Sequence, residues 1–167
     1  TFPPHPYAIW SDASGSAAGG VIAEIGWLRF AWSDEVIENT TSDAGACMMP
    51  SLEGAALSLS VETLAAQPGF DRSRGLVAGI DNSSFIAAAL RGRSNSRMMH
   101  AALTIIYDIF PQVRFYHINS AANPSDYPSR LATSPLQVLR ANPASTYGKD
   151  LSQVKPFCPL TSRLLLS

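Results

Sequence analysis

The chain has 167 residues, of which 46% are hydrophobic and 15% are charged, with a formal net charge of −1. This length suits one compact domain with a sizeable core, and the composition excludes a largely disordered chain. No apolar run approaches the roughly 20 residues that a membrane-spanning helix needs, so we expect no membrane partner.

The small net charge conceals an uneven distribution. Residues 1–70 contain eight acidic side chains and one basic side chain, whereas residues 71–167 contain eleven basic and five acidic side chains. This division suggests an acidic site on one part of the surface and an anion-facing surface on another. Because charged faces are usually just solvated, the division alone identifies no ligand.

The cysteines and the N-terminus bear on cellular location. Cys47 and Cys158 match neither a metal-binding spacing nor a disulfide framework, so we expect a reduced, intracellular setting. Residues 1–6 contain no basic region followed by an apolar stretch, so we expect no signal peptide and no secretion. Because the sequence begins with Thr1, we expect it to be a segment of a longer polypeptide.

The N-terminal part of the chain has the pattern of three antiparallel strands. The first strand, residues 7–12, ends on an acid and is followed by turn-forming residues 13–16. Residues 19–26 and 27–37 are typical of two further strands joined by a tight connection. Residues 38–50 are small and polar, so we expect a loop there.

Helices alternate with buried strands in the next part. Ser51 can cap a helix that extends to about residue 67, because its hydroxyl can accept a backbone N–H. The mostly apolar residues 76–81 fit a buried parallel strand. In chain order, the remaining predicted elements are a helix over 82–90, a helix over 96–110, a strand over 113–118 and a short helix over 124–131.

This order of elements predicts an α/β fold with a mixed five-stranded sheet flanked by helices. Three antiparallel strands come first, and two parallel strands are then added. We expect the domain to occupy residues 1–131. Residues 132–167 are rich in Pro, Ser and Leu without clear periodicity, which predicts an extended C-terminal tail or linker.

Four acidic residues lie where they can converge on one rim of this fold. Asp12 and Asp81 end two predicted strands, and α/β sheets place ligands in the crevice at strand ends. Glu53 lies in the first turn of the first predicted helix, and Asp126 in the first turn of the last. Each acid alone has an ordinary explanation as a turn former or a helix-start acid. The interpretation as a site therefore depends on all four together.

Converging carboxylates point to metal-ion chemistry. Ionised carboxylates repel one another, so such a cluster is stable only when cations neutralise it. Oxygen ligands without nearby His or Cys favour Mg²⁺ or Mn²⁺ over zinc. Two such ions about 4 Å apart can activate a water and stabilise the leaving oxygen of a phosphodiester. We therefore predict that two ions are held by the catalytic residues Asp12, Glu53, Asp81 and Asp126.

Four motifs carry a resemblance to a known family. In chain order they are Ser11-Asp12-Ala13-Ser14, Ser51-Leu52-Glu53-Gly54-Ala55-Ala56, Gly79-Ile80-Asp81-Asn82-Ser83, and His117-Ile118 with Asn123-Pro124-Ser125-Asp126-Tyr127-Pro128-Ser129-Arg130. Across roughly residues 7–131, the chain resembles the ribonuclease H domain of reverse transcriptases, especially those of tyrosine-recombinase retrotransposons and hepadnavirus-like polymerases. The last two motifs are specific, whereas the first two are weak in isolation.

The resemblance implies a ribonuclease H-like fold, hydrolysis of the RNA strand of RNA–DNA hybrids, and metal binding by the same four acids. The 45 residues from Asp81 to Asp126 leave no obvious room for the basic protrusion of cellular ribonucleases H. This departure favours a domain of a reverse-transcribing polyprotein, which relies on an adjoining reverse transcriptase domain to grip the hybrid.

Further residues are candidates for contacts with the hybrid. The predicted nucleic-acid-binding residues are Ser14, Gly15, Asn82, Arg91, Arg93, Asn95 and Arg97. Arginine forks suit phosphate contacts, and polar groups beside the scissile bond can recognise the RNA 2′-hydroxyl. A solvated basic turn explains the arginines equally well, and simple turn formation explains the others equally well.

Two residues are candidates for a supporting role beside the acids. Arg130 lies four residues after Asp126, where a helical ion pair can orient that carboxylate. His117 can protonate a leaving group or assist product release. Its position in a strand next to Phe115 favours a packed structural histidine instead.

Three functions compete for this sequence. The first is an active ribonuclease H domain of a retroelement or viral polymerase. The second is a catalytically silent ribonuclease H-like module used for binding or scaffolding, which would have no reason to keep four mutually repelling carboxylates. The third is another nuclease of the superfamily, such as a DNA-strand transferase or junction resolvase, which the motifs around Asp81 and Asp126 disfavour. Substrate choice among hybrid, RNA duplex and DNA discriminates the third from the first.

Overall fold

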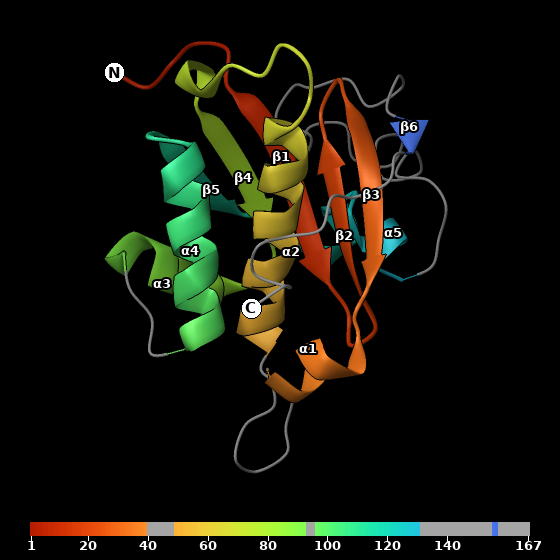
Figure 1. The fold of residues 1–167 in the computed structure, drawn as a ribbon. Coiled ribbons are helices and arrows are strands. Elements are labelled where there is room, and N and C mark those ends of the chain that lie inside the picture. The colour runs from red at the N-terminus through yellow and green to blue at the C-terminus, as the bar shows by residue number, and fades with distance from the viewer. Residues whose placement is uncertain (40–48, 93–95, 131–154, 157–167) are drawn as a thin grey trace.

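A mixed β-sheet forms the centre of the molecule (Figure 1). The computed structural model describes residues 1–39, 49–92, 96–130 and 155–156. The strands are β1 (Tyr7–Ala13), β2 (Ala17–Ile22), β3 (Gly26–Ala31), β4 (Leu76–Ile80), β5 (Val113–His117) and β6 (Lys155–Pro156), in the spatial order β5-β4-β1-β2-β3-β6.

The directions of the strands follow the predicted scheme. β1, β2 and β3 are antiparallel neighbours, and β4 and β5 are added in parallel beside β1. The five-stranded mixed sheet is therefore confirmed. The two residues of β6, which belong to the predicted tail, pair in parallel with β3 at the other edge.

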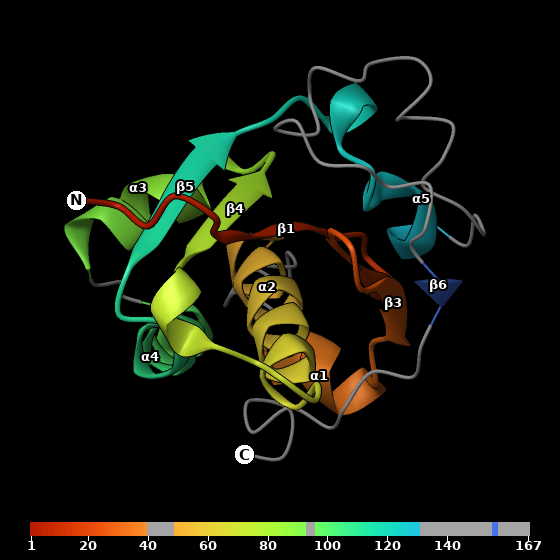
Figure 2. The same ribbon diagram turned by 90° about the horizontal axis from the view of Figure 1, so that it is seen from above.

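Helices cover both faces of the sheet. They are α1 (Asp34–Asn39), α2 (Met49–Ala65), α3 (Ser83–Arg91), α4 (Arg97–Ile109) and α5 (Asp126–Ser129), with 3₁₀ turns η1 (Arg72–Arg74) and η2 (Ser120–Ala122). Seen from above, α2 lies under β1 with α4 beside it, and α5 lies on the opposite face (Figure 2). The acid-bearing end of β1 thus lies between α2 on one face and α5 on the other.

The helix α2 is a core element along most of its length. Every residue from 51 to 61 is buried, so the helix has no polar face toward solvent. Three of its hydroxyls, those of Ser58, Ser60 and Thr63, donate to carbonyl oxygens three or four residues earlier. Because each of these hydroxyls has an acceptor within the helix, none of the three is left unpaired when α2 packs between the sheet and α4.

The strand predicted over residues 27–37 is wrong in its second half. β3 ends at Ala31, and residues 34–39 form α1. Asp34 and Glu35 lie in the first turn of α1, where the helix dipole favours negative charge. Of the loop predicted over 38–50, residues 38–39 and 49–50 are helical, and residues 40–48 lie outside the described part of the chain.

The start of α2 also differs from the prediction. α2 already begins at Met49, so Pro50 lies in its first turn. Proline is tolerated there because the backbone N–H groups of a first turn make no hydrogen bond within the helix. Ser51 is therefore not the N-cap, and its hydroxyl lies 2.6 Å from the hydroxyl of Ser96. Consequently Glu53 lies in the second turn of the helix, not in the first. The final helix, α5, is shorter than the predicted 124–131.

Close backbone contact docks α5 on the sheet. A Cβ added at Gly19 of β2 would lie 2.5 Å from the carbonyl oxygen of Ser125 and 2.6 Å from the backbone nitrogen of Ser129. Just before α5, the side-chain amide of Asn123 donates to the carbonyl oxygen of Ser11 over 3.0 Å, and its Oδ1 accepts from the backbone N–H and hydroxyl of Ser125. These contacts fix α5 beside the end of β1.

We expect Gly19→Ala to lower the free energy of unfolding by about 1–3 kcal/mol, because the new methyl group must displace backbone atoms of α5. Gly15→Ala is the matched control, since no atom lies within 4 Å of a Cβ added there, and its effect should stay within about 0.5 kcal/mol. Urea unfolding followed by circular dichroism measures both changes. Equal stabilities of the two variants would show that α5 moves away from β2 without cost.

Candidate functional site

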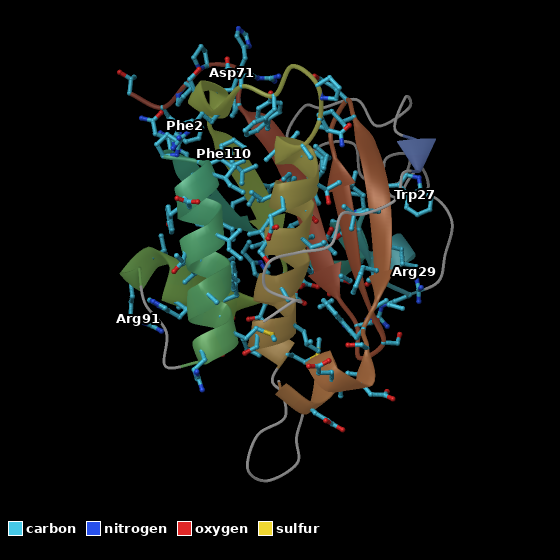
Figure 3. All side chains as sticks on the ribbon, viewed as in Figure 1. Phe2, Trp27, Arg29, Asp71, Arg91 and Phe110 are labelled. Atoms are coloured by element: carbon cyan, nitrogen blue, oxygen red, sulfur yellow. The ribbon has the colours of Figure 1, made fainter. Side chains whose placement is uncertain are left out.

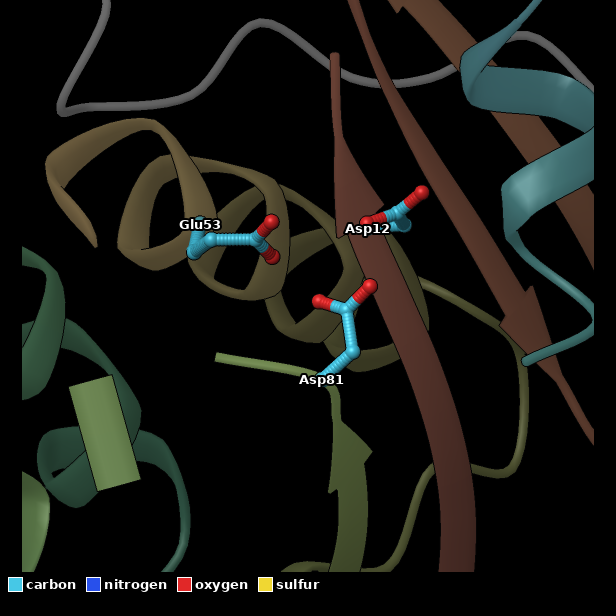
Figure 4. Close-up of side chains that lie close together, drawn as sticks. All are labelled: Asp12, Glu53 and Asp81. Carbon is cyan, nitrogen blue, oxygen red and sulfur yellow. The ribbon is translucent and has the colours of Figure 1, made fainter. Parts of the chain in front are cut away.

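Three acidic side chains meet at the carboxyl ends of β1 and β4 (Figure 4). Asp12 lies near the end of β1, Asp81 directly follows β4, and Glu53 reaches the same place from α2. One carboxylate oxygen from each residue lies within 4.8 Å of the others. The structure therefore brings together three of the four acids predicted from the sequence.

Burial strongly affects the ionisation of this cluster. The side chains of Asp12 and Glu53 are each only 3% exposed, whereas Asp81 is half-buried. Burial, with the charge of Asp81 added, raises the pKa of Asp12 to about 7. Burial, with the charges of Asp12 and Asp81 added, raises the pKa of Glu53 to about 9. At neutral pH without a cation, Glu53 therefore holds a proton.

The two oxygens of Glu53 have different surroundings. Oε1 accepts a hydrogen bond of 3.3 Å from the backbone N–H of Ala13. Oε2 is buried and has no hydrogen-bond partner among the described residues. Buried polar atoms normally have a partner, so this oxygen is available to a ligand that the described residues do not supply.

Two serine hydroxyls contact the aspartates. The hydroxyl of Ser129 on α5 donates to Oδ2 of Asp12 over 2.9 Å. The hydroxyl of Ser120 in η2 donates to Oδ2 of Asp81 over 2.6 Å. Neither serine was predicted to have a role from the sequence, because a contact between residues 117 or 39 positions apart leaves no periodic signal. For Ser129, the only signal was its place in the closing motif.

Asp126 approaches the cluster from the opposite face of the sheet. As the first residue of α5 it interacts with Asp12, but it does not belong to the group within 4.8 Å. Nε of Arg130 donates to Oδ1 of Asp126 over 2.8 Å, so the predicted ion pair is present. The arginine is largely exposed, so the pair acts mainly to restrict the direction of the carboxylate.

The predicted nucleic-acid-binding residues near the acids have local structural partners. The Oδ1 of Asn82 accepts the backbone N–H of Phe85 over 2.8 Å and so caps α3. The hydroxyl of Ser14 accepts the backbone N–H of Ala17 and donates to the carbonyl oxygen of Ser129 over 2.7 Å. Gly15 is exposed. Contacts of these residues with nucleic acid stay predictions.

The predicted arginines lie at the ends of α3 and α4. Arg91 is the last residue of α3 and Arg97 the first of α4, and both are exposed. Figure 3 shows Arg91 at the outer edge of the molecule. Arg93 and Asn95, which were predicted to bind with them, lie outside the described residues.

His117 is not a packed structural histidine, and that interpretation was wrong. It is the last residue of β5, pairs with Ile80 and is exposed. Phe115, two residues earlier, instead packs against Phe85 with ring centroids 5.9 Å apart. Because β5 runs parallel to β4, His117 lies at the same carboxyl-terminal end of the strands as Asp81.

No family model and no curated protein matches this sequence. Two solved structures resemble it in fold. Ribonuclease H1 from the halophilic archaeon Halobacterium salinarum NRC-1 has a TM-score of 0.52 and 16% identity, over 72% of this chain and 90% of that chain. LC11 ribonuclease H1, isolated from compost, has a TM-score of 0.51 and 16% identity, over 77% of this chain and 95% of that chain. The chain thus has the predicted ribonuclease H-like fold. Among the described residues, no helix has the length and apolar character needed to cross a membrane.

We expect the stability of the metal-free protein to fall as pH rises from about 5 to about 9. Both raised pKa values, about 7 for Asp12 and about 9 for Glu53, mean that the folded state binds protons more tightly than the unfolded state. The stabilisation is complete below the unfolded pKa values and is lost as pH rises through the folded ones. The loss should be on the order of a few kcal/mol.

Urea unfolding in a chelator across this pH range measures the loss. Glu53→Gln should flatten the dependence, because it removes the acid with the higher folded pKa. Asp108→Asn, which alters an exposed acid on α4, should leave the dependence unchanged. A wild-type stability that does not vary with pH would contradict the burial of ionisable carboxyls in this cluster.

Proposed function

We propose that this domain is a ribonuclease H, an endonuclease that hydrolyses the RNA strand of RNA–DNA hybrids with two Mg²⁺ or Mn²⁺ ions. The observation that carries the proposal is the convergence of buried Asp12, Glu53 and Asp81 at the ends of parallel strands within a ribonuclease H-like fold. Asp126, adjoining Asp12 from α5, is the fourth proposed ligand.

The donor set fits a hard divalent cation. The three converging groups offer only carboxylate oxygens, which suit Mg²⁺ or Mn²⁺. The raised pKa values of Asp12 and Glu53 show that these two acids resist ionising without positive charge nearby, and among the described residues no group donates to Oε2 of Glu53. When bound, the ions would supply an activated water and neutralise charge on the leaving oxygen.

The protein's own groups would hold and orient the substrate. Exposed Arg91 and Arg97 offer forked donors to phosphates without reading sequence. Ser14, Gly15 and Asn82 lie on the segments that follow or flank Asp12 and Asp81, where the RNA 2′-hydroxyl would be recognised. His117 is exposed at the rim, where it can give a proton to the leaving oxygen.

We further propose that the domain belongs to a reverse-transcribing polyprotein and acts inside a host cell beside an adjoining reverse transcriptase domain. The four motifs support this context, and only residues 92–96 connect α3 to α4, so no basic protrusion is inserted there. With residues 1–131 as the catalytic domain and 132–167 as a tail or linker, the short contact of β6 with β3 is a contribution of the tail to the sheet.

We expect the protein to cut the RNA strand of an end-labelled RNA–DNA hybrid with Mg²⁺ or Mn²⁺, and to leave RNA duplex and DNA duplex intact. Asp81→Asn should lower the rate about a thousandfold, since metal ions contribute several kcal/mol to such a transition state. The variant should fold normally, because it relieves repulsion in the metal-free cluster. Asp108→Asn is the control outside the cluster.

The same assay separates the competing functions. Cleavage by Asp81→Asn at a rate near that of the wild type would rule out the proposed metal site. A folded wild-type protein that binds hybrid but cuts nothing would favour the silent module. Cleavage of DNA duplex in preference to the hybrid would favour another nuclease of the superfamily.

We expect hybrid binding by the isolated domain to be weak and salt-dependent, because phosphate contacts release counterions. Arg91→Ala and Arg97→Ala should each weaken binding and reduce the slope of log K against log salt by about 1. Arg72→Ala is the matched control: it is also exposed, but η1 precedes β4 and lies at the opposite end of the sheet from the acids. Fluorescence anisotropy at several salt concentrations measures the slopes, and tight binding indifferent to salt would contradict the phosphate assignment.

A further inference from the structure

The hydroxyl of Ser129 connects α5 to the acid at the end of β1. Ser129 is fully buried, and its Oγ lies 2.9 Å from Oδ2 of Asp12. The same Oγ lies 3.0 Å from the carbonyl oxygen of Asp126. A serine hydroxyl has one proton, and a charged acceptor makes the stronger hydrogen bond. When Asp12 is ionised, Ser129 therefore donates to it.

The position of Ser129 is set by contacts that do not involve Asp12. Its backbone nitrogen approaches β2 at Gly19, where a Cβ would collide with it. That nitrogen also donates to the carbonyl oxygen of Ser125 over 3.1 Å, and the carbonyl oxygen of Ser129 accepts the hydroxyl of Ser14 over 2.7 Å. The backbone that carries the hydroxyl is thus held in place independently of Asp12.

The two oxygens of the Asp12 carboxylate have different neighbours. In Figure 4, one of its oxygens points toward α5 and the other toward Glu53 and Asp81. A hydrogen bond on one oxygen fixes the plane of the carboxylate and so the direction of the other oxygen. In metal sites, hydrogen bonds to ligating carboxylates typically serve this purpose.

We propose that Ser129 is a positioning residue that orients Asp12 for binding of the divalent cation. This inference rests on the proposed function, because it concerns the same cluster of acids. Its consequence is that α5 contributes to the site in two ways, by carrying Asp126 and by fixing Asp12 from the side.

The test measures Mn²⁺ binding by calorimetry on the full chain without nucleic acid. Ser129→Ala removes the donor but keeps the backbone contacts of α5, and we expect the affinity for Mn²⁺ to fall about tenfold or more. In hybrid cleavage, kcat should fall while KM for the hybrid is unchanged, since Ser129 is buried away from substrate.

Ser125→Ala is the matched control. Ser125 is also fully buried in the same segment, but its hydroxyl donates to Oδ1 of Asn123 instead of to an acid. We expect Ser125→Ala to bind Mn²⁺ as the wild type does. An equal loss in both variants would show that loosening of α5, and not the hydrogen bond to Asp12, lowers the affinity, which would overturn the proposal.

Ser129→Cys provides a second variant if Ser129→Ala does not fold by circular dichroism. Its thiol fills the place of the hydroxyl, although it is somewhat larger, and is a weak donor, so it should show the same loss of affinity. Unchanged Mn²⁺ affinity in a folded Ser129 variant would overturn the positioning role, and so would the failure of both variants to fold. A wild-type protein that binds no Mn²⁺ would instead refute the proposed metal site itself.

Discussion

The mutual repulsion of buried carboxylates is the constraint on which this site depends. Asp12 and Glu53 are almost fully removed from water and face Asp81, so burial and the charges of the neighbouring acids both oppose their ionisation. Bringing these acids together without a cation is energetically unfavourable. The rest of the fold imposes this arrangement, because the parallel pairing of β1 with β4 places two strand ends side by side, and α2 packs against β1.

The surroundings of the acids are correspondingly rigid. Glu53 projects from a helix that is buried on all sides, so its backbone cannot shift without disturbing the core. Asp12 lies on a central strand with paired neighbours on both sides. A site for a small, hard cation needs ligands held within a fraction of an ångström, and core elements provide this better than loops do.

Most of this fold could be predicted because each strand and helix leaves its own pattern of apolar residues in the sequence. Runs of apolar residues ending on an acid identified β1 and β4, and from those ends the convergence of Asp12 and Asp81 followed. The segment after Ala31 was misassigned because a few apolar residues among polar ones fit a strand or a short helix equally well. The exposure of His117 and the hydroxyl contacts of Ser120 and Ser129 depend on where β5 ends and how α5 docks. Those are properties of tertiary packing, and no pattern within one element contains them.

The docking of α5 also sets an order of events during synthesis. A helix of four residues is too short to form by itself, so it gains its shape only by attachment to β1 and β2. On a growing chain, β1, α2 and β4 emerge from the ribosome well before residues 126–130. An incomplete nascent chain can therefore assemble three of its acids, but it lacks Asp126 and the hydroxyl beside Asp12. If the proposed function holds, the nuclease remains unfinished until this segment has been made.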